Sequence, residues 1–220
     1  MVPRVIRLSR RGLAAATLAV ALVCTPATGL AEDGATQITT DPAFDTSPYW
    51  SPDGTQIAFV SDRSGSFDLW TIPATGGTAT QVTTDPAVDE RPSWSPDGSQ
   101  IAFSSNRSGN YDLWVIPAAG GVATQITLDP AEDVHTSWSP DGSQLAFHSA
   151  RESDWDIWTI PAVGGTATRI TDDPRDAGSP AWSPDGSLIA LCLDDGDWDV
   201  YVVPATGGIL TPVTGGPAHD

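Results

Sequence analysis

Three aspartates recur at a fixed interval and are the residues of this sequence best suited to bind an ion. Asp45, Asp89 and Asp133 lie 44 residues apart, with Asp220 in the same phase and Ala177 interrupting the series. Carboxylate oxygens are the ligands that a hard cation such as Ca²⁺ prefers. If the fold gathers these side chains they predict a Ca²⁺ site, and otherwise they form a solvated set of acidic loops.

No catalytic constellation accompanies these carboxylates. The sequence has no Gly-x-Ser-x-Gly elbow, no His-Glu-x-x-His and no phosphate-binding glycine loop. Its three histidines, His135, His148 and His219, are scattered along the chain, so we expect structural roles for them. Cys192 is the only cysteine after residue 31, so we expect no internal disulfide there. The sequence therefore predicts a protein that is not an enzyme and that needs no cofactor other than the Ca²⁺ just considered.

The charge of the chain excludes several partners. All 28 acidic residues lie after residue 31, where six arginines and no lysine oppose them, and the whole chain carries a formal net charge of −18. Nucleic-acid binding depends on Lys and Arg displacing counterions from phosphates, and anionic membranes attract the same side chains. We therefore expect no nucleic acid and no anionic lipid among the partners.

Residues 1–31 have the pattern of an export signal. Four arginines within the first eleven positions precede an apolar run from residue 12 to residue 24, and small residues fit a cleavage after Ala31. Arg10 and Arg11 also resemble a twin-arginine signal, so both export routes stay open. We expect a mature chain of residues 32–220 in the periplasm or outside the cell, with no membrane span.

One pentapeptide, Trp-Ser-Pro-Asp-Gly, occurs four times at intervals of 44 residues. The copies begin at Trp50, Trp94, Trp138 and Trp182. Ser-Pro-Asp-Gly is a β-turn sequence, and within each repeat a Gly-Gly pair and an Asp-Pro pair mark two further turns. Turns about every ten residues leave room for strands but not for helices of ordinary length.

Each repeat therefore predicts four short antiparallel strands. In the first repeat one strand ends at Trp50, the second extends through Phe59, the third holds Leu69 and Trp70, and the fourth is 79–83. A lone sheet of this kind cannot bury both faces, so the copies should stack around an axis. The fold class expected for residues 32–220 is an all-β β-propeller of four-stranded blades, with four complete repeats of about 44 residues and partial repeats at both ends.

The predicted fold also predicts where the tryptophans, three arginines and the recurring aspartates lie. The two tryptophans of each repeat should pack between blades. Arg63, Arg107 and Arg151, in the loops between second and third strands, should pair with acids across neighbouring blades. Asp45, Asp89 and Asp133 should precede the innermost strands and gather near one mouth of the central channel.

The repeat resembles that of TolB-like propellers, also called WD-repeat-like. The resemblance rests on Trp-Ser-Pro-Asp-Gly, followed by Ile-Ala-Phe and Asp-Leu-Trp, and covers residues 35–220. It implies the propeller fold and a general role in protein contact, and it implies no reaction. Two departures are that TolB carries a mixed α/β domain before its propeller and that such propellers usually have six or seven blades.

The two ends of the repeat array carry one outer strand too many for four blades. Residues 35–39 and 209–214 both have the phase of a fourth strand. Either the chain is a piece of a longer array, or chains self-associate to complete the ring, or one terminal strand is left unpaired. If the array is longer, the DNA after codon 220 should encode another copy of the motif.

The function favoured by these observations is an exported, non-enzymatic propeller that acts as a protein–protein interaction scaffold in the cell envelope or outside it. The first alternative is a carbohydrate- or cation-binding module that uses the channel mouth. The second is the propeller fragment of a larger envelope protein or hydrolase.

Overall fold

The computed structural model describes residues 36–152, 154–194 and 196–214 of the 220-residue chain. The predicted export signal, residues 1–31, lies outside the described residues, as do His219 and Asp220. No helix in the described part of the chain is long and apolar enough to cross a membrane.

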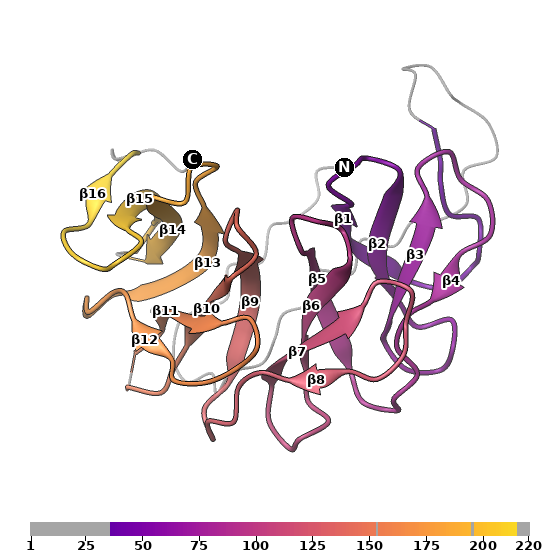
Figure 1. Cartoon of the computed structure of the whole chain (residues 1–220), viewed down its shortest axis with the longest axis horizontal. Coiled ribbons are helices and arrows are strands. Elements are labelled where there is room, and N and C mark those ends of the chain that lie inside the picture. Colours follow the sequence, from indigo (N-terminus) through magenta and orange to yellow (C-terminus); the bar gives the residue numbers. More distant parts are fainter. Residues whose placement is uncertain (1–35, 153, 195, 215–220) are drawn as a thin grey trace, which may run out of the picture. The chain divides into compact units, whose positions relative to one another are not determined.

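The described residues form four antiparallel sheets, each from one sequence repeat and each with its strands in chain order (Figure 1). The first sheet contains β1 (Asp45–Trp50), β2 (Gln56–Ser61), β3 (Asp68–Pro73) and β4 (Thr80–Gln81). The second contains β5 (Asp89–Trp94), β6 (Gln100–Ser105), β7 (Asp112–Pro117) and β8 (Thr124–Gln125).

The other two sheets repeat this arrangement. The third contains β9 (Asp133–Trp138), β10 (Gln144–Ser149), β11 (Asp156–Pro161) and β12 (Thr168–Arg169). The fourth contains β13 (Asp176–Trp182), β14 (Leu188–Asp194), β15 (Trp198–Pro204) and β16 (Thr211–Pro212). The predicted all-β propeller architecture of four-stranded blades is confirmed.

The outermost strand of each sheet is shorter than predicted. Only Thr80 and Gln81 pair with β3, although the sequence pattern extends to Thr83. Past Gln81 a side chain enters the ladder, because the Leu69 amide donates to the Thr83 hydroxyl at 2.9 Å. The chain thereby leaves the sheet two residues early and turns toward the next blade.

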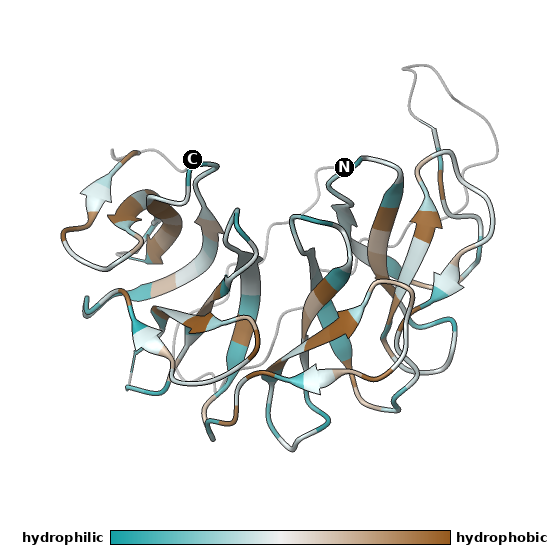
Figure 2. Cartoon of the chain, viewed as in Figure 1, coloured by the Kyte–Doolittle hydropathy of each residue, from teal (hydrophilic) through white to brown (hydrophobic). Residues whose placement is uncertain are grey.

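Apolar residues lie between successive sheets, in three clusters. One cluster joins the first and second sheets through residues such as Leu69 and Phe103, and equivalent clusters join the second to the third and the third to the fourth. Figure 2 shows that the apolar residues concentrate in the central strands of the sheets. The first and fourth sheets do not pack against each other in the described part of the chain.

Where two sheets meet, tryptophans pack between the blades as predicted. Trp138 is 7 % exposed and Trp158 is 8 % exposed, and both belong to the cluster between the second and third sheets. Trp50, the first of the series, is instead 61 % exposed, because none of the described sheets covers that face of the first sheet.

The Gly-Gly turns allow successive blades to approach closely. Gly120 has φ +83°, and a Cβ placed on it would lie 3.3 Å from the carbonyl oxygen of Val82, which belongs to the preceding repeat. We expect Gly120→Ala to lower the free energy of unfolding by about 1–2 kcal/mol, because it adds left-handed strain at a tight contact. Chemical denaturation measures this. Gly54→Ala is the control, since Gly54 has φ +68° with no atom within 4 Å of the added Cβ. An equal loss in both variants would contradict the role of the interblade contact.

Candidate functional site

The three aspartates predicted to gather are each bound by an arginine of their own sheet. Asp45 pairs with Arg63, Asp89 with Arg107, and Asp133 with Arg151, each with an N–O distance of 2.7 Å. The predicted pairing of these arginines with acids is confirmed, but the prediction that it crosses blades is wrong. The register explains this, because Asp89 lies opposite Ser105 in the ladder and Arg107 follows two residues later.

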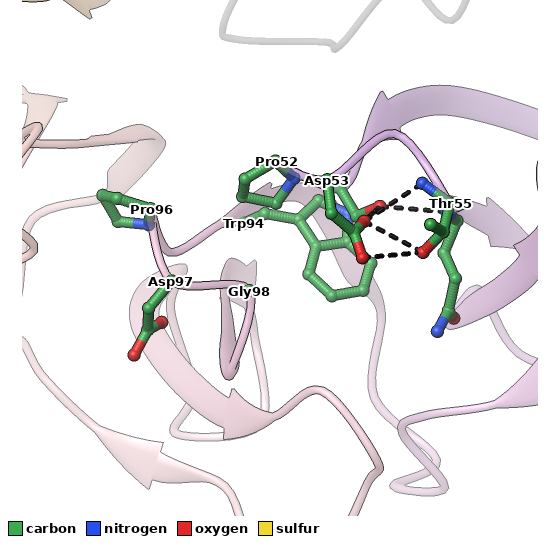
Figure 3. Close-up of a pocket in the computed structure, with 9 residues that line it drawn as sticks. Pro52, Asp53, Thr55, Trp94, Pro96, Asp97 and Gly98 are labelled. Carbon is green, nitrogen blue, oxygen red and sulfur yellow. Dashed lines mark hydrogen bonds between the residues drawn. The ribbon is translucent and has the colours of Figure 1, made fainter.

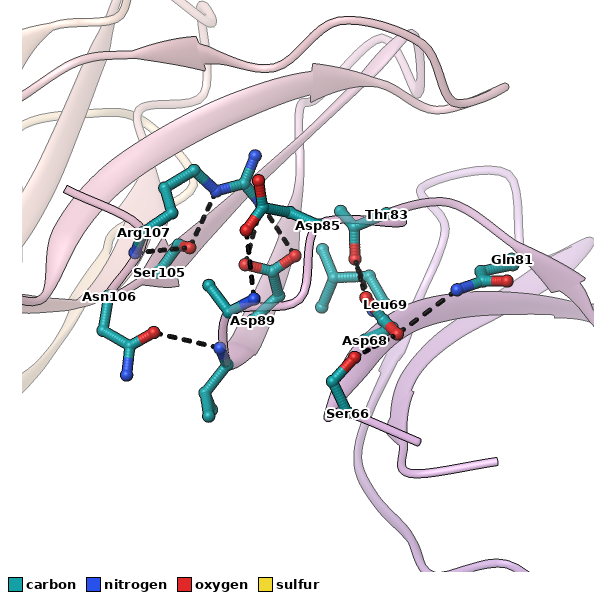
Figure 4. Close-up of polar contacts among 12 residues, drawn as sticks. Ser66, Asp68, Leu69, Gln81, Thr83, Asp85, Asp89, Ser105, Asn106 and Arg107 are labelled. Carbon is teal, nitrogen blue, oxygen red and sulfur yellow. Dashed lines mark hydrogen bonds and ion pairs between the residues drawn. The ribbon is translucent and has the colours of Figure 1, made fainter. Parts of the chain in front are cut away.

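Each arginine is fixed on several sides. Arg107 donates through Nε to the Ser105 hydroxyl at 2.9 Å, and its guanidinium lies 4.8 Å from the Trp114 ring centroid and 5.3 Å from that of Phe103. Cation–π contact and the ion pair therefore act on the same group. Figure 4 shows the Asp89–Arg107 pair with Ser105, all from the second sheet, and Asp68 of the first sheet in the same view.

The carboxylates of these pairs are removed from water to different degrees. The side chains of Asp89 and Asp133 are 0 % exposed, whereas that of Asp45 is 16 % exposed. Burial raises the pKa of Asp89 and Asp133, although serine and arginine hydrogen bonds oppose it. Among the described residues no group of three or more His, Cys, Asp or Glu side chains could hold a metal ion. The Ca²⁺ hypothesis stays a prediction, which calorimetric titration of Ca²⁺ into the purified protein tests.

The fourth sheet lacks the aspartate and reaches a similar arrangement from another position. Ala177 stands where the series is broken, and Arg175 in the preceding loop lies 5.0 Å from the Tyr201 ring centroid. Arg175 also pairs with Asp173 at 2.7 Å and donates to the Tyr201 hydroxyl at 3.0 Å. Tyr201 occupies the position of Trp70, so an arginine covers this aromatic position in all four sheets.

The structure contains a second polar cluster, formed by two histidines and an arginine, that the sequence pattern did not predict. His135 Nδ1 lies 3.1 Å from His148 Nε2 and 3.2 Å from Arg91 Nη1. The His148 ring also contacts the Trp155 ring edge-on, at 4.8 Å between centroids. The expectation of structural roles for the histidines did not include this contact between two of them.

A bulge on the innermost strands creates this cluster. Ser47, Arg91, His135 and Ser179 all have positive φ, between 50° and 57°, and each lies where the pairing register of its strand shifts. Such a residue leaves the regular alternation of the strand, so its side chain is re-aimed. The 44-residue spacing of Arg91 and His135 was the available signal, since equal phase places them on neighbouring inner strands.

Both histidines are held in the neutral form. Burial and then the charge of Arg91 lower the pKa of His135 to about 4. Burial, followed by His135 and Arg91, lowers the pKa of His148 to about 2. Nδ1 of His148 is buried and has no hydrogen-bond partner in the described structure. Near neutral pH the pair is thus uncharged and half-buried.

A groove lies between the Ser-Pro-Asp-Gly turns of the first two sheets (Figure 3). It has a volume of about 370 Å³, and Trp94, Asp53 and Asp97 are among its lining residues. The aspartates serve their own turns. Asp97 accepts from the Ser95 hydroxyl at 2.7 Å and the Ser99 amide at 3.0 Å, and these bonds lower its pKa to about 2. The predicted turn role of this aspartate is confirmed, and it keeps the groove negatively charged.

The exposed charges on the described surface are negative. All six arginines after residue 31 take part in ion pairs, and each is half-buried. Every charged side chain that is exposed in the described structure is a carboxylate. These are Asp41, Asp53, Asp62, Asp97, Glu132, Asp141, Glu152, Asp172, Asp176 and Asp185.

Sheets of four antiparallel strands, packed face to face in chain order with their first strands adjacent, define a β-propeller. The family model of the tricorn protease N-terminal β-propeller domain matches residues 66–155. No curated protein matches the sequence at a significant level.

Several solved structures share the fold. A protein described as a TolB from Agrobacterium tumefaciens is 22 % identical with a TM-score of 0.69, over 80 % of this chain and 83 % of the other. TolB from Acinetobacter baumannii is 23 % identical with a TM-score of 0.70, over 83 % of this chain and 46 % of the other. The resemblance of the repeat to TolB-like propellers is confirmed by these matches.

The same fold also occurs in enzymes. Oligogalacturonate lyase from Vibrio parahaemolyticus is 16 % identical with a TM-score of 0.67, over 80 % of this chain and 55 % of the other. A puromycin hydrolase is matched over 84 % of this chain but only 30 % of its own length. The chain thus spans about half of the second and third of these structures and less of the fourth.

Proposed function

We propose that the chain is an exported, non-enzymatic β-propeller that binds a protein partner in the periplasm or outside the cell, and that this partner presents basic side chains. The observation that carries the proposal is the one-sided surface of the described residues, on which the six arginines after residue 31 are ion-paired and the exposed charged side chains are carboxylates. Such a surface attracts a basic protein face and speeds its association. The ion pairs and the neutral histidines described above support a structural role for the interior polar groups.

Salt dependence tests this function. The immobilised protein is incubated with envelope extract at about 0.1 M and about 1 M salt, because the Debye length falls from about 10 Å to about 3 Å between them. We expect one or more basic proteins to be retained at the lower salt and released at the higher. Retention that is unaffected by salt, or retention of acidic proteins alone, would contradict a basic partner.

Neutralising two exposed carboxylates sharpens the test. Glu132 and Glu152 flank one end of the third sheet, where Asp133 pairs with Ser149. We expect Glu132→Gln with Glu152→Gln to slow association with the captured partner by about 2–10-fold, measured by surface plasmon resonance at low salt. Val122→Thr is the matched control, since Val122 is 87 % exposed and the change carries no charge. An equal rate in all variants would place the contact elsewhere.

A second candidate function is suggested by the share of each neighbour that is covered. The matched part is 46 % of TolB from Acinetobacter baumannii and 30 % of a puromycin hydrolase. The chain could therefore serve as the propeller of a larger protein with a further domain. The DNA sequence beyond codon 220 tests this, since it would encode further repeats or a catalytic domain.

A further inference from the structure

Every interface between successive sheets in this chain is built in the same way. One sheet contributes a face that we call the trailing face, formed in the first sheet by Ala58, Val60, Leu69 and Val82. The next sheet contributes a face that we call the leading face, formed in the second sheet by Trp94, Ile101, Phe103, Trp114 and Ile116. The other two interfaces use residues at the corresponding positions.

Hydrogen bonds also recur across these interfaces. The Asp89 amide donates to the Phe67 carbonyl at 2.8 Å, and the Asp133 amide donates to the Tyr111 carbonyl at 2.8 Å. The indole of Trp94 donates to the Tyr49 carbonyl at 3.2 Å, and that of Trp138 to the Ser93 carbonyl at 3.0 Å. In the first two interfaces a leading face therefore brings an amide and an indole to two carbonyls of a trailing face. The third interface keeps the amide bond, from Ala177 to the Trp155 carbonyl at 2.7 Å, whereas the Trp182 indole nitrogen has no partner in the described structure.

The first and last sheets each present one such face without a covering sheet. On the leading face of the first sheet, Trp50 is 61 % exposed and Ile57 is half-buried, whereas the counterparts of Ile57 in the other three sheets are 0 % exposed. On the trailing face of the fourth sheet, Ala190 is half-buried, whereas Ala102 and Ala146 are 0 % exposed. Each free face has the residue types of the faces buried inside the chain.

Residues 37–39, which precede the first sheet, lie where the outer strand of a preceding blade would lie. The Ile38 carbonyl lies 3.6 Å from the Cβ position of Gly76, as the Ile126 carbonyl lies 3.5 Å from that of Gly164. Residues 37–39 therefore lie beside the leading face where a preceding blade would place the end of its fourth strand. The inner three strands of that blade are what the first sheet lacks.

The outer strand of the fourth sheet lacks one polar contact that the outer strands of the other sheets make. In the first two sheets a glutamine of this strand donates to the buried aspartate of the third strand, Gln81 to Asp68 at 3.2 Å and Gln125 to Asp112 at 3.0 Å. The fourth sheet has Pro212 at this position, which offers no donor to Asp199, whereas Val213 and Thr214 keep the bonds to Val200 and Asp199 that their counterparts make. Gln37, Ile38 and Thr39 restore the residue types of Gln81, Val82 and Thr83.

We propose that two copies of this chain associate head to tail, with the leading face of one copy on the trailing face of the fourth sheet of the other. In this arrangement residues 37–39 replace residues 211–214 as the outer strand of the second copy's fourth sheet, and Gln37 donates to Asp199 there. The Trp50 indole donates to the Ala181 carbonyl and the Asp45 amide to the Trp198 carbonyl, as in the first two internal interfaces.

The occupant is a second copy because the blades of this repeat carry faces that pack against each other inside the chain, and each copy has one uncovered face of each kind. Two copies satisfy both ends and close a ring of eight blades, which lies within the range of about 4–8 blades seen in propellers. A head-to-tail contact that closes gives a dimer, and one that does not close gives a filament.

Sedimentation velocity of the purified protein tests the proposal. We expect a species of twice the 23.0 kDa chain mass, or twice the mass of the processed chain, with a concentration-dependent monomer. Trp50→Glu in the leading face and Val202→Glu in the trailing face should each raise the dissociation constant at least tenfold. Val122→Glu is the control, because Val122 is 87 % exposed and lies on neither face.

Mixing the two variants distinguishes head-to-tail association from other dimers. A mixture of Trp50→Glu with Val202→Glu retains one intact interface per pair, so it should recover a heterodimer weaker than the wild-type dimer. Circular dichroism must show that both variants stay folded, and if Val202→Glu unfolds, Ala190→Glu replaces it. A monomeric wild type, a filament, a dimer that only one variant weakens, or no recovery on mixing would each overturn the proposal.

Discussion

Arg107→Met should destabilise the protein by about 3–5 kcal/mol at neutral pH. The substitution keeps a long side chain against Trp114 and Phe103 but removes the charge that faces Asp89, whose side chain is 0 % exposed. A buried carboxylate without its counter-charge carries an uncompensated desolvation penalty of this size. Guanidinium denaturation at pH 7 measures the change in unfolding free energy.

The matched control is Arg63→Met in the first sheet. Its partner Asp45 is 16 % exposed, so water can solvate the carboxylate that remains, and the loss should be less than half as large. The double substitution Asp89→Leu with Arg107→Met should recover most of the loss, because it removes both charges together. Equal losses at the two arginines would contradict burial as the cause.

The pH dependence of the same variant has a definite sign. Burial already raises the pKa of Asp89 above its ordinary value, and loss of Arg107 raises it further. Between the unfolded and folded pKa values the native state binds more protons than the unfolded state, so stability increases as pH falls through that window. The deficit of Arg107→Met should therefore shrink between pH 7 and pH 5. A deficit that grows toward acid would contradict this account.

The repeat predicted most of the fold because its turn-forming residues act locally. The Ser-Pro-Asp-Gly turn, the Gly-Gly turn and the alternation between them act within a few residues, and the strands follow at Gln56–Ser61 and Asp68–Pro73 as expected. The outer strand was overestimated because the Thr83 hydroxyl takes over a ladder bond from the backbone. A sequence pattern cannot distinguish a hydroxyl that replaces the ladder from one that faces solvent.

The polar sites were less predictable because they depend on register and on the bulge. Asp89 and Arg107 are 18 residues apart, and only the pairing of Asp89 with Ser105 shows that they share one end of one sheet. In a strand without a bulge, His135 would follow the regular alternation and would not turn toward His148. In physical terms, the repeat encodes the ladder, whereas its local interruptions determine which polar side chains meet.

The two histidines should make the protein lose stability as pH falls from 6.5 toward 4. The folded pKa of His135 is about 4 and that of His148 about 2, both below the ordinary histidine value of 6.5. Between these values the unfolded state binds more protons than the native state, so their stabilising contribution is complete above pH 6.5 and decreases below it. His135 alone contributes about 3 kcal/mol over this window, since one pKa unit corresponds to about 1.4 kcal/mol.

The surrounding charges do not reverse this sign. Arg91 faces His135, and Glu90, which pairs with Arg91 at 3.3 Å, lies on the same strand. Asp97, Asp141 and Asp185 have pKa values of about 2, so they lose their charge below the window. The raised pKa values of Asp89 and Asp133 act in the opposite direction and reduce the slope.

The experiment compares the wild type with His135→Ser and His148→Val, residue types found at the same positions of the first repeat as Ser47 and Val60. Denaturation midpoints are measured at pH 7.5, 6.0, 5.0 and 4.5, on the order of one unit apart. These values cover the range in which the unfolded histidines become protonated. The wild type should lose stability steadily toward pH 4.5, and the double variant, which removes the contributions of both histidines, should lose about 5 kcal/mol less over the same range. Both proteins must first show the same β-sheet circular dichroism at pH 7.5. Parallel curves would mean that the imidazoles are not desolvated as the structure places them, because a desolvated histidine cannot become charged in the folded state without this cost.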